Sequence, residues 1–131
     1  MKKLAIIGLM GILGGCAFIM PQAPFDNAEY GELNKMYTYT DIYRAECGDT
    51  VKTKKNFAEL SLSSTLVVNY DKDIPNNENS VAAVIELDKL IQTANTQMQS
   101  GERSTKFCEM KLDAVKQSIG TVKAAVAKRR H

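Results

Sequence analysis

Two stretches in the C-terminal half of this chain carry apolar residues at the spacing of one face of an α-helix. In residues 80–100 these positions advance by three or four residues at each step: Val84, Leu87, Ile91, Ala94 and Met98. In residues 104–126 they advance in the same way: Cys108, Leu112, Val115, Ile119, Val122 and Val126. Narrow apolar stripes of this kind suit antiparallel helices that pack side by side. The two stretches therefore predict an all-α fold.

Capping residues and glycines mark the ends of these helices and of a first helix. Asp26 is placed to cap that first helix, with Glu29 three residues further on as in a capping box, and Gly48 ends it. Its inner face is expected to hold Leu33, Met36, Tyr37, Thr40, Tyr43 and Cys47. Asn79 or Ser80 is the expected cap of the third helix, which ends at Gly101. Ser104 is the expected cap of the fourth.

The second segment, after Asp49 or Thr50 as its cap, has a weaker helical face: Val51, Lys55, Ala58, Leu62, Leu66 and Asn69. We predict a helix to about residue 66, with a strand over residues 60–70 as the alternative, because "LSLSSTLVVNY" alternates and then becomes β-branched. Residues 71–80, "DKDIPNNENS", predict a loop in which Asp71 and Asp73 face solvent. The expected architecture is a small four-helix array.

The N-terminus has the pattern of an export signal. Lys2 and Lys3 precede the uncharged run "LAIIGLMGILGG", as in a secretory signal peptide. Its end, Leu13-Gly14-Gly15-Cys16, resembles the lipobox of bacterial lipoproteins. This resemblance implies that residues 1–15 are removed and that Cys16 is acylated. Residues 16–26 would then form the lipidated N-terminus and tether, and residues 27–131 a helical periplasmic domain.

Two other interpretations of the N-terminus stay open. Residues 4–20 are uncharged and have about the minimum length for a membrane anchor, although four glycines weaken such a helix. A buried core helix is the other alternative. If the lipobox is used, position 17 is alanine rather than the aspartate that retains many lipoproteins at the inner membrane. The expected location is therefore the outer membrane, facing the periplasm.

Export also predicts the state of the remaining cysteines. With Cys16 lipidated, Cys47 and Cys108 remain, and in an oxidising compartment such a pair is most simply a disulfide. Two free thiols are the alternative if the chain stays in the cytoplasm. No metal or cofactor is expected, because there is no Cys-x-x-Cys motif and the only histidine is His131.

Charge and motifs narrow the function classes. Without residues 1–15 the chain has 15 basic and 15 acidic residues, a balance that argues against nucleic-acid binding. The charges are uneven: residues 16–50 are mainly acidic and residues 106–131 mainly basic, so these ends either attract one another or are solvated helix faces. The final Lys-Arg-Arg-His is expected to be a frayed basic end, which the anionic headgroups of a membrane would attract. No catalytic motif is present, and we expect no enzyme.

The layout resembles the pilotins of type II secretion, small outer-membrane lipoproteins that ferry secretin subunits. The similarity consists of a lipobox, a tether, four helices and cysteines in "DIYRAECGD" and "STKFCEMKLDAV". It implies that a groove between helices binds an amphipathic helix of an envelope protein. The alternatives are a phage- or plasmid-encoded lipoprotein that masks an envelope receptor or a lytic enzyme, and a structural envelope subunit.

A candidate partner surface lies in the second segment, which has more apolar residues than one helix face needs. We place it at Phe57, Leu60, Leu66 and Val67. The alternative is that these four side chains simply fill the core.

Overall fold

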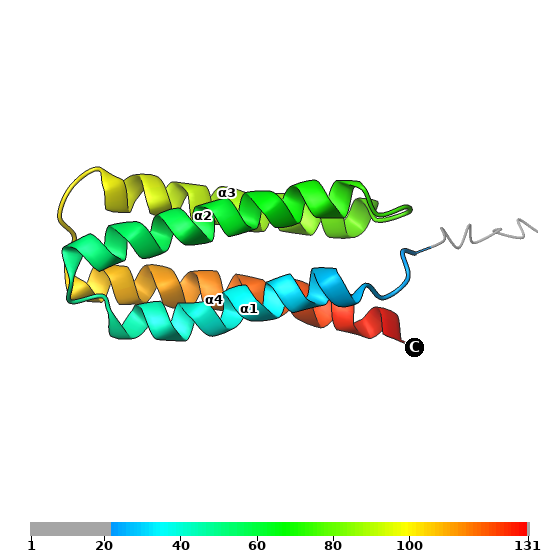
Figure 1. Ribbon diagram of the computed structural model, residues 1–131, viewed down its shortest axis with the longest axis horizontal. Helices are drawn as coiled ribbons and strands as arrows, with labels where there is room; N and C mark the ends of the chain where they lie inside the picture. The colour runs from blue at the N-terminus through cyan, green and yellow to red at the C-terminus, as the bar shows by residue number, and fades with distance from the viewer. Residues whose placement is uncertain (1–21, 131) are drawn as a thin grey trace, which may run out of the picture.

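The computed structural model describes residues 22–130 and consists of four antiparallel α-helices (Figure 1). The helices are α1 (Asn27–Ala45), α2 (Thr50–Lys72), α3 (Glu78–Gln99) and α4 (Thr105–Ala127). A short 3₁₀ turn, η1 (Lys128–Arg130), follows α4. No strand occurs in the described part of the chain, so the all-α, four-helix prediction is confirmed. Residues 1–15 and Cys16 lie outside the described residues.

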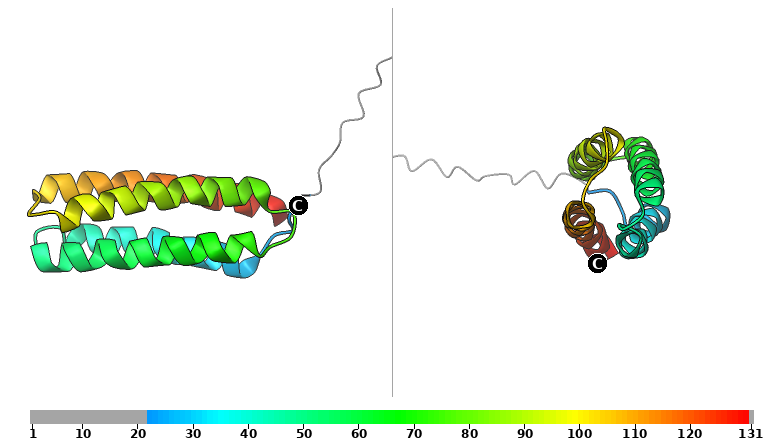
Figure 2. Two further views of the ribbon diagram at one scale, coloured as in Figure 1. Left: turned by 90° about the horizontal axis from the view of Figure 1, so that it is seen from above. Right: turned by 90° about the vertical axis from the view of Figure 1, so that its left-hand side faces the viewer.

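Each helix packs against its neighbours in a ring, so that α1 and α4 form one side and α2 and α3 the opposite side (Figure 2). Residues 22–26, residues 73–77 and η1 lie at one end of the bundle, which we call the tether end (Figure 1). Residues 46–49 and 100–104 connect the helices at the other end, the disulfide end. The two ends of the described chain therefore lie close to each other.

Three of the four predicted helix caps are confirmed. The Asp26 carboxylate accepts hydrogen bonds from the N–H groups of Ala28 and Glu29, at 2.8 and 2.9 Å. Asp49 and Ser104 accept from the N–H groups of Lys52 and Phe107 in the same way. Each carboxylate or hydroxyl satisfies N–H groups that the first helical turn leaves without partners.

The start of α3 was predicted wrongly. Its cap is Asn77, rather than Asn79 or Ser80, and the Asn77 side chain makes no capping hydrogen bond. The Asn77 amide instead donates to the carbonyl oxygen of Asp71 at 3.1 Å and so links the end of α2 to the start of α3. The loop between these helices is therefore shorter than predicted, at residues 73–77 instead of 71–80.

The second helix is longer than predicted, because α2 continues to Lys72 and the strand alternative is wrong. The predicted face of this helix is wrong, because all six of its residues are exposed: Val51, Lys55, Ala58, Leu62, Leu66 and Asn69. The buried face instead passes, in the second half of α2, through Ser64, Val67, Val68 and Asp71, which keep helical spacing to the last turn. Two of these buried positions are polar, so the apolar pattern fades although the packed face continues. Burial against α3 outweighs the small helix penalty of β-branched residues.

The core is one cluster along the bundle axis, to which all four helices contribute. The predicted disulfide is confirmed between Cys47 and Cys108, whose Cα atoms are 5.6 Å apart. Cys47 lies just beyond the end of α1 rather than on its inner face, so the bridge joins the α1–α2 loop to α4. The core, the disulfide and the capping contacts all lie within residues 22–130.

The acidic and basic ends of the chain pair across the α1–α4 contact. Lys116 of α4 lies 2.6 Å from the Asp41 carboxylate of α1, and Arg129 lies 2.9 Å from Glu29. Of the two interpretations of this uneven charge, the structure therefore supports mutual attraction for these pairs.

Candidate functional site

The four residues of the predicted partner surface do not share one environment. Phe57, Leu60 and Val67 are buried in the core, with at most 4% of each residue exposed. For these three the partner-surface prediction is wrong and the core-filling alternative is correct. Leu66, by contrast, is 59% exposed. Adjacent residues on a helix point about 100° apart, which explains why Val67 is buried and Leu66 is not.

Further exposed apolar side chains accompany Leu66 on the outside of α2. Leu62, one helical turn earlier, is 62% exposed, and Tyr70, one turn later, is 42% exposed. Residues four positions apart lie next to each other on a helix surface. We call Leu62, Leu66 and Tyr70 the α2 stripe. Val51, Ile42 and Met110 are also exposed, at other places on the surface.

Two tyrosine hydroxyls place the α2 stripe beside the contact between α1 and α2. The Tyr43 hydroxyl of α1 donates to the Glu59 carboxylate of α2 at 2.7 Å, and burial together with this bond raises the pKa of Tyr43. The Tyr70 hydroxyl donates to Asp26, just before α1, at 3.0 Å, and this bond raises the pKa of Tyr70. Glu59, Leu66 and Tyr70 lie on one side of α2 by helical spacing. Leu66 is therefore an exposed apolar side chain between two polar links.

The α1 side of this contact is aromatic. The rings of Tyr39 and Tyr43 lie 5.6 Å apart, and Lys35 lies over the Tyr39 ring. Tyr39 is only partly buried. Aromatic residues that combine an apolar ring with a polar tip are common in protein–protein interfaces. We therefore take the α2 stripe, with Tyr39 on the neighbouring helix, as the candidate contact surface.

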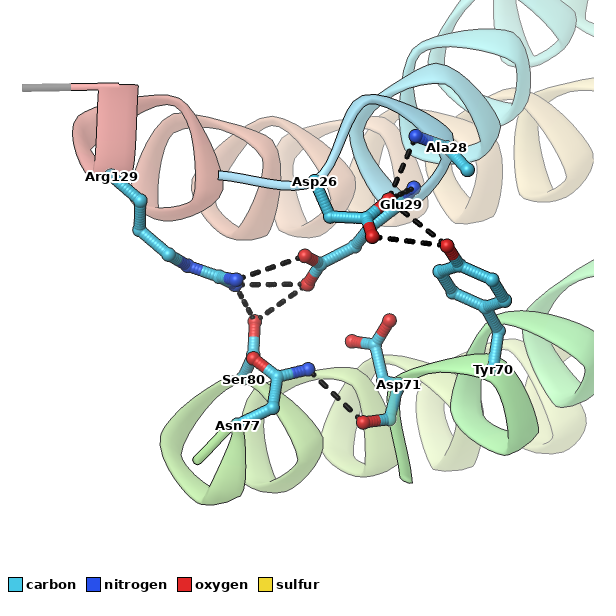
Figure 3. A network of polar contacts seen from close by, with 8 residues as sticks. All are labelled: Asp26, Ala28, Glu29, Tyr70, Asp71, Asn77, Ser80 and Arg129. Carbon is cyan, nitrogen blue, oxygen red and sulfur yellow. Dashed lines mark hydrogen bonds and ion pairs between the residues drawn. The ribbon is translucent and has the colours of Figure 1, made fainter. Parts of the chain in front are cut away.

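A second cluster, at the tether end, is polar and buried (Figure 3). Glu29 has no exposed surface, and its carboxylate accepts two hydrogen bonds from Arg129, at 3.0 and 2.9 Å. The Ser80 hydroxyl donates to the same carboxylate at 2.9 Å. These contacts connect the first turn of α1, the first turn of α3 and η1. The cluster therefore acts as a clamp that holds the C-terminal turn against the bundle.

Asp71 is the unusual member of this clamp. It has no exposed surface, neither carboxyl oxygen accepts a hydrogen bond from an N–H or O–H group of another residue, and the side chain points toward the Glu29 carboxylate (Figure 3). The prediction that Asp71 faces solvent is therefore wrong, whereas Asp73 is exposed as predicted. Burial, followed by the negative charge of Glu29, raises the pKa of Asp71 to about 8. Asp71 is thus mainly protonated at neutral pH.

The burial of the clamp limits its chemistry. Glu29 and Asp71 are closed off from solvent, so a substrate does not reach either carboxyl group.

Within residues 22–130 no three His, Cys, Asp or Glu side chains form a group suited to a metal ion. None of the described helices combines the length and apolar character that a membrane span requires. Comparison with known protein families, curated proteins and solved structures finds no match for this chain.

Sequence reasoning did not find the clamp. Arg129 lies in the basic C-terminal run and Asp71 in a stretch that was predicted to be a loop, so neither has a local signal of burial. The one signal in the sequence was the uneven charge, with a mainly acidic stretch at residues 16–50 and a mainly basic stretch at residues 106–131, for which mutual attraction was one of two interpretations. Cys16, the predicted lipidation site, lies outside the described residues.

Proposed function

We propose that this chain is a lipoprotein of the bacterial outer membrane that is anchored through Cys16, faces the periplasm and binds another envelope protein. The signal pattern and the Leu13-Gly14-Gly15-Cys16 motif support the anchor. The disulfide is consistent with an oxidising compartment. In this proposal the protein works by contact, in the manner of a pilotin, and its partner contributes an amphipathic helix.

The observation that carries the binding proposal is the pair Leu62 and Leu66, two exposed leucines one turn apart on a helix whose other large aliphatic side chains, Val51 excepted, lie in the core. Complete burial of a leucine contributes about 1.5–3 kcal/mol. Since the two side chains are more than half exposed, covering both would contribute about 2–3 kcal/mol before ordering costs. A partner helix with apolar residues at three- and four-residue spacing fits such a stripe.

The test is crosslinking in the bacterial envelope. A photoreactive amino acid in place of Leu66 is expected to give a discrete adduct with one envelope protein, and a secretin subunit is the adduct that the pilotin proposal predicts. Adding the substitution Leu62→Glu should abolish this adduct, because a carboxylate in the contact remains without a partner when buried. Circular dichroism should show unchanged helix content, since position 62 is exposed.

Met110→Glu is the matched control, because Met110 is 55% exposed on α4 near the disulfide end and lies outside the stripe. It should leave the adduct unchanged. If Met110→Glu removes the adduct as well, or if no adduct forms at position 66, the α2 stripe is not the binding site. An adduct with a receptor or a lytic enzyme would instead support the inhibitory lipoprotein.

A further inference from the structure

Basic and aromatic side chains alternate along the contact between α1 and α4, beginning at the tether end. Arg130 lies over the rings of Phe25 and Tyr30, at 4.3 and 4.8 Å from their centres. Lys123 lies 4.2 Å from the centre of the Tyr37 ring and 5.9 Å from that of Tyr30. We call Phe25, Tyr30, Lys123, Lys128 and Arg130 the basic–aromatic face.

In the part of the chain that the structure describes, the cations of this face are not paired with carboxylates. Among residues 22–130, no ion pair involves Lys123, Lys128 or Arg130, whereas the neighbouring Arg129 is bound to Glu29. Lys123 donates only to the neutral side chain of Asn34. Lys128, alone of these three cations, lines a shallow hollow of about 680 Å³, together with Tyr37, Gly120, Ala124, Lys116 and Asp113, among others. The face therefore offers positive charge and open space next to aromatic rings.

The position of this face relative to Cys16 is limited by chain length. Gln22, the first described residue, follows Cys16 by six residues. Six residues span at most about 21 Å when fully extended. Ala23 is fixed at the tether end, where its N–H donates to the carbonyl oxygen of Asn76 at 3.0 Å. A lipid on Cys16 would therefore keep the tether end close to the bilayer surface.

We propose that the basic–aromatic face binds the anionic headgroups of the membrane to which the chain is anchored. Lys and Arg are attracted to anionic lipids, and amphipathic aromatic side chains favour the interface between water and lipid. The proposal commits to a lipid surface because Lys123, Lys128 and Arg130, which have no ion pair among residues 22–130, lie at the same end of the molecule as the tether. It rests on the proposed lipid anchor, but the binding itself can be measured without the lipid.

The experiment uses the chain from residue 16 with Cys16→Ser, which keeps every core, cap and disulfide residue. Its helix content and its disulfide are checked first. Flotation with vesicles of phosphatidylglycerol and phosphatidylcholine should retain the protein, vesicles of phosphatidylcholine alone should not, and about 0.5 M salt should release it because it screens the charges. Absence of lipidation would overturn the anchor but leave this result intact, so the two failures are distinguishable.

A triple charge variant tests which residues bind. Each basic group near an anionic surface contributes about a fivefold gain in affinity. The combined substitution should therefore weaken vesicle binding about a hundredfold: Lys123→Gln, Lys128→Gln and Arg130→Gln. The matched control removes the same charge at the disulfide end and should change binding little: Lys52→Gln, Lys54→Gln and Lys55→Gln.

A fluorescent reporter tests the orientation. The chain contains no tryptophan, so Phe25→Trp introduces a single indole at the tether end and Met110→Trp a single indole near the disulfide end. Anionic vesicles should shift the emission of the first variant to the blue and leave that of the second unchanged. Equal binding to neutral vesicles, no binding to either kind, equal weakening by both triple variants, or no shift at position 25 would each overturn the proposal.

Discussion

At the scale of single residues, Asp71 shows how the position of one carboxyl group makes stability depend on pH. The side chain is fully buried beside the Glu29 carboxylate, and neither of its oxygens accepts a hydrogen bond from an N–H or O–H group of another residue. The charged form of a carboxyl group is unfavourable in this buried position. The folded protein therefore keeps Asp71 protonated at pH values well above the ordinary pKa of aspartate. The unfolded chain releases that proton at its ordinary pKa of 3.8.

This difference in protonation predicts a pH-dependent free energy of unfolding. Between about pH 4 and pH 8 the folded state binds a proton that the unfolded state does not, so the contribution of Asp71 to stability is greatest below this window and is lost as pH rises through it. The slope is at most about 1.4 kcal/mol per pH unit. Urea unfolding of the wild type at pH 5 and pH 8 should show lower stability at pH 8.

Asp71→Asn should reduce the difference in stability between pH 5 and pH 8. It should also be more stable than the wild type at pH 8, because a side-chain amide stays uncharged throughout this pH range. Asp73→Asn is the control, since Asp73 is exposed two residues away. It should keep the pH dependence of the wild type. Equal pH dependence in all three proteins would contradict the role given to Asp71.

Asp71 also shows, by contrast with the helix caps, which features can be predicted from the sequence and which cannot. Asp26, Asp49 and Ser104 were correctly predicted as caps because each contacts N–H groups within the next three residues. The groups that surround Asp71 belong to α1 and to η1, Glu29 and Arg129, and both are far from it in the sequence. A local pattern of aspartate, proline and asparagine therefore predicted a solvent-facing loop.

At the scale of helices, α2 shows a similar limit. The excess of apolar residues in this segment was visible in the sequence, but the phase of the helix decides which of them point outward. The buried phase includes Ser64 and Asp71, so polar residues mark part of the inner face. Leu62 and Leu66 fall on the outer face, although leucine is more often buried than exposed. Polar residues, such as their neighbours Ser61 and Thr65, are more usual on an exposed face. The candidate surface was thus predicted in the right helix but mostly on the wrong side.

The disulfide is the second feature at this scale, and its contribution to stability can be predicted. It joins positions separated by 61 residues, a loop for which the chain-entropy model gives about 4 kcal/mol. The double variant Cys47→Ala and Cys108→Ala should lose about this much free energy of unfolding in urea. It should also be insensitive to reductant, whereas reduction of the wild type should cause a comparable loss. Two reactive thiols in the folded, exported wild type would contradict the bridge.

At the scale of the whole molecule, the two proposed surfaces are compatible with each other. The basic–aromatic face lies along α1 and α4, whereas the α2 stripe lies beside the contact between α1 and α2 and reaches the tether end at Tyr70 (Figure 2). In a chain held to the membrane by Cys16 and by this face, Leu66 and Leu62 would remain open to the periplasm, because they lie one and two helical turns further from the tether end than Tyr70. Membrane attachment would also raise the effective concentration of the stripe toward other envelope proteins without any additional contact.

The anchor itself gives the last prediction. One acyl chain binds membranes only marginally, at about 10⁴ M⁻¹, whereas two or more chains give lasting attachment. If Cys16 is acylated, the wild type should incorporate a fatty-acid analogue and remain in the membrane fraction at high salt, because apolar burial is not screened by ions.

Cys16→Ser should carry no label and should not be cleaved before position 16, since the thiol that accepts the lipid is gone. The triple charge variant of the basic–aromatic face is the informative control. It should keep its label and its membrane attachment, because the acyl chains alone are sufficient for anchoring. Equal labelling of the wild type and Cys16→Ser would exclude the lipobox. Membrane attachment of an unlabelled Cys16→Ser chain at high salt would instead support the uncharged run at residues 4–20 as a membrane anchor.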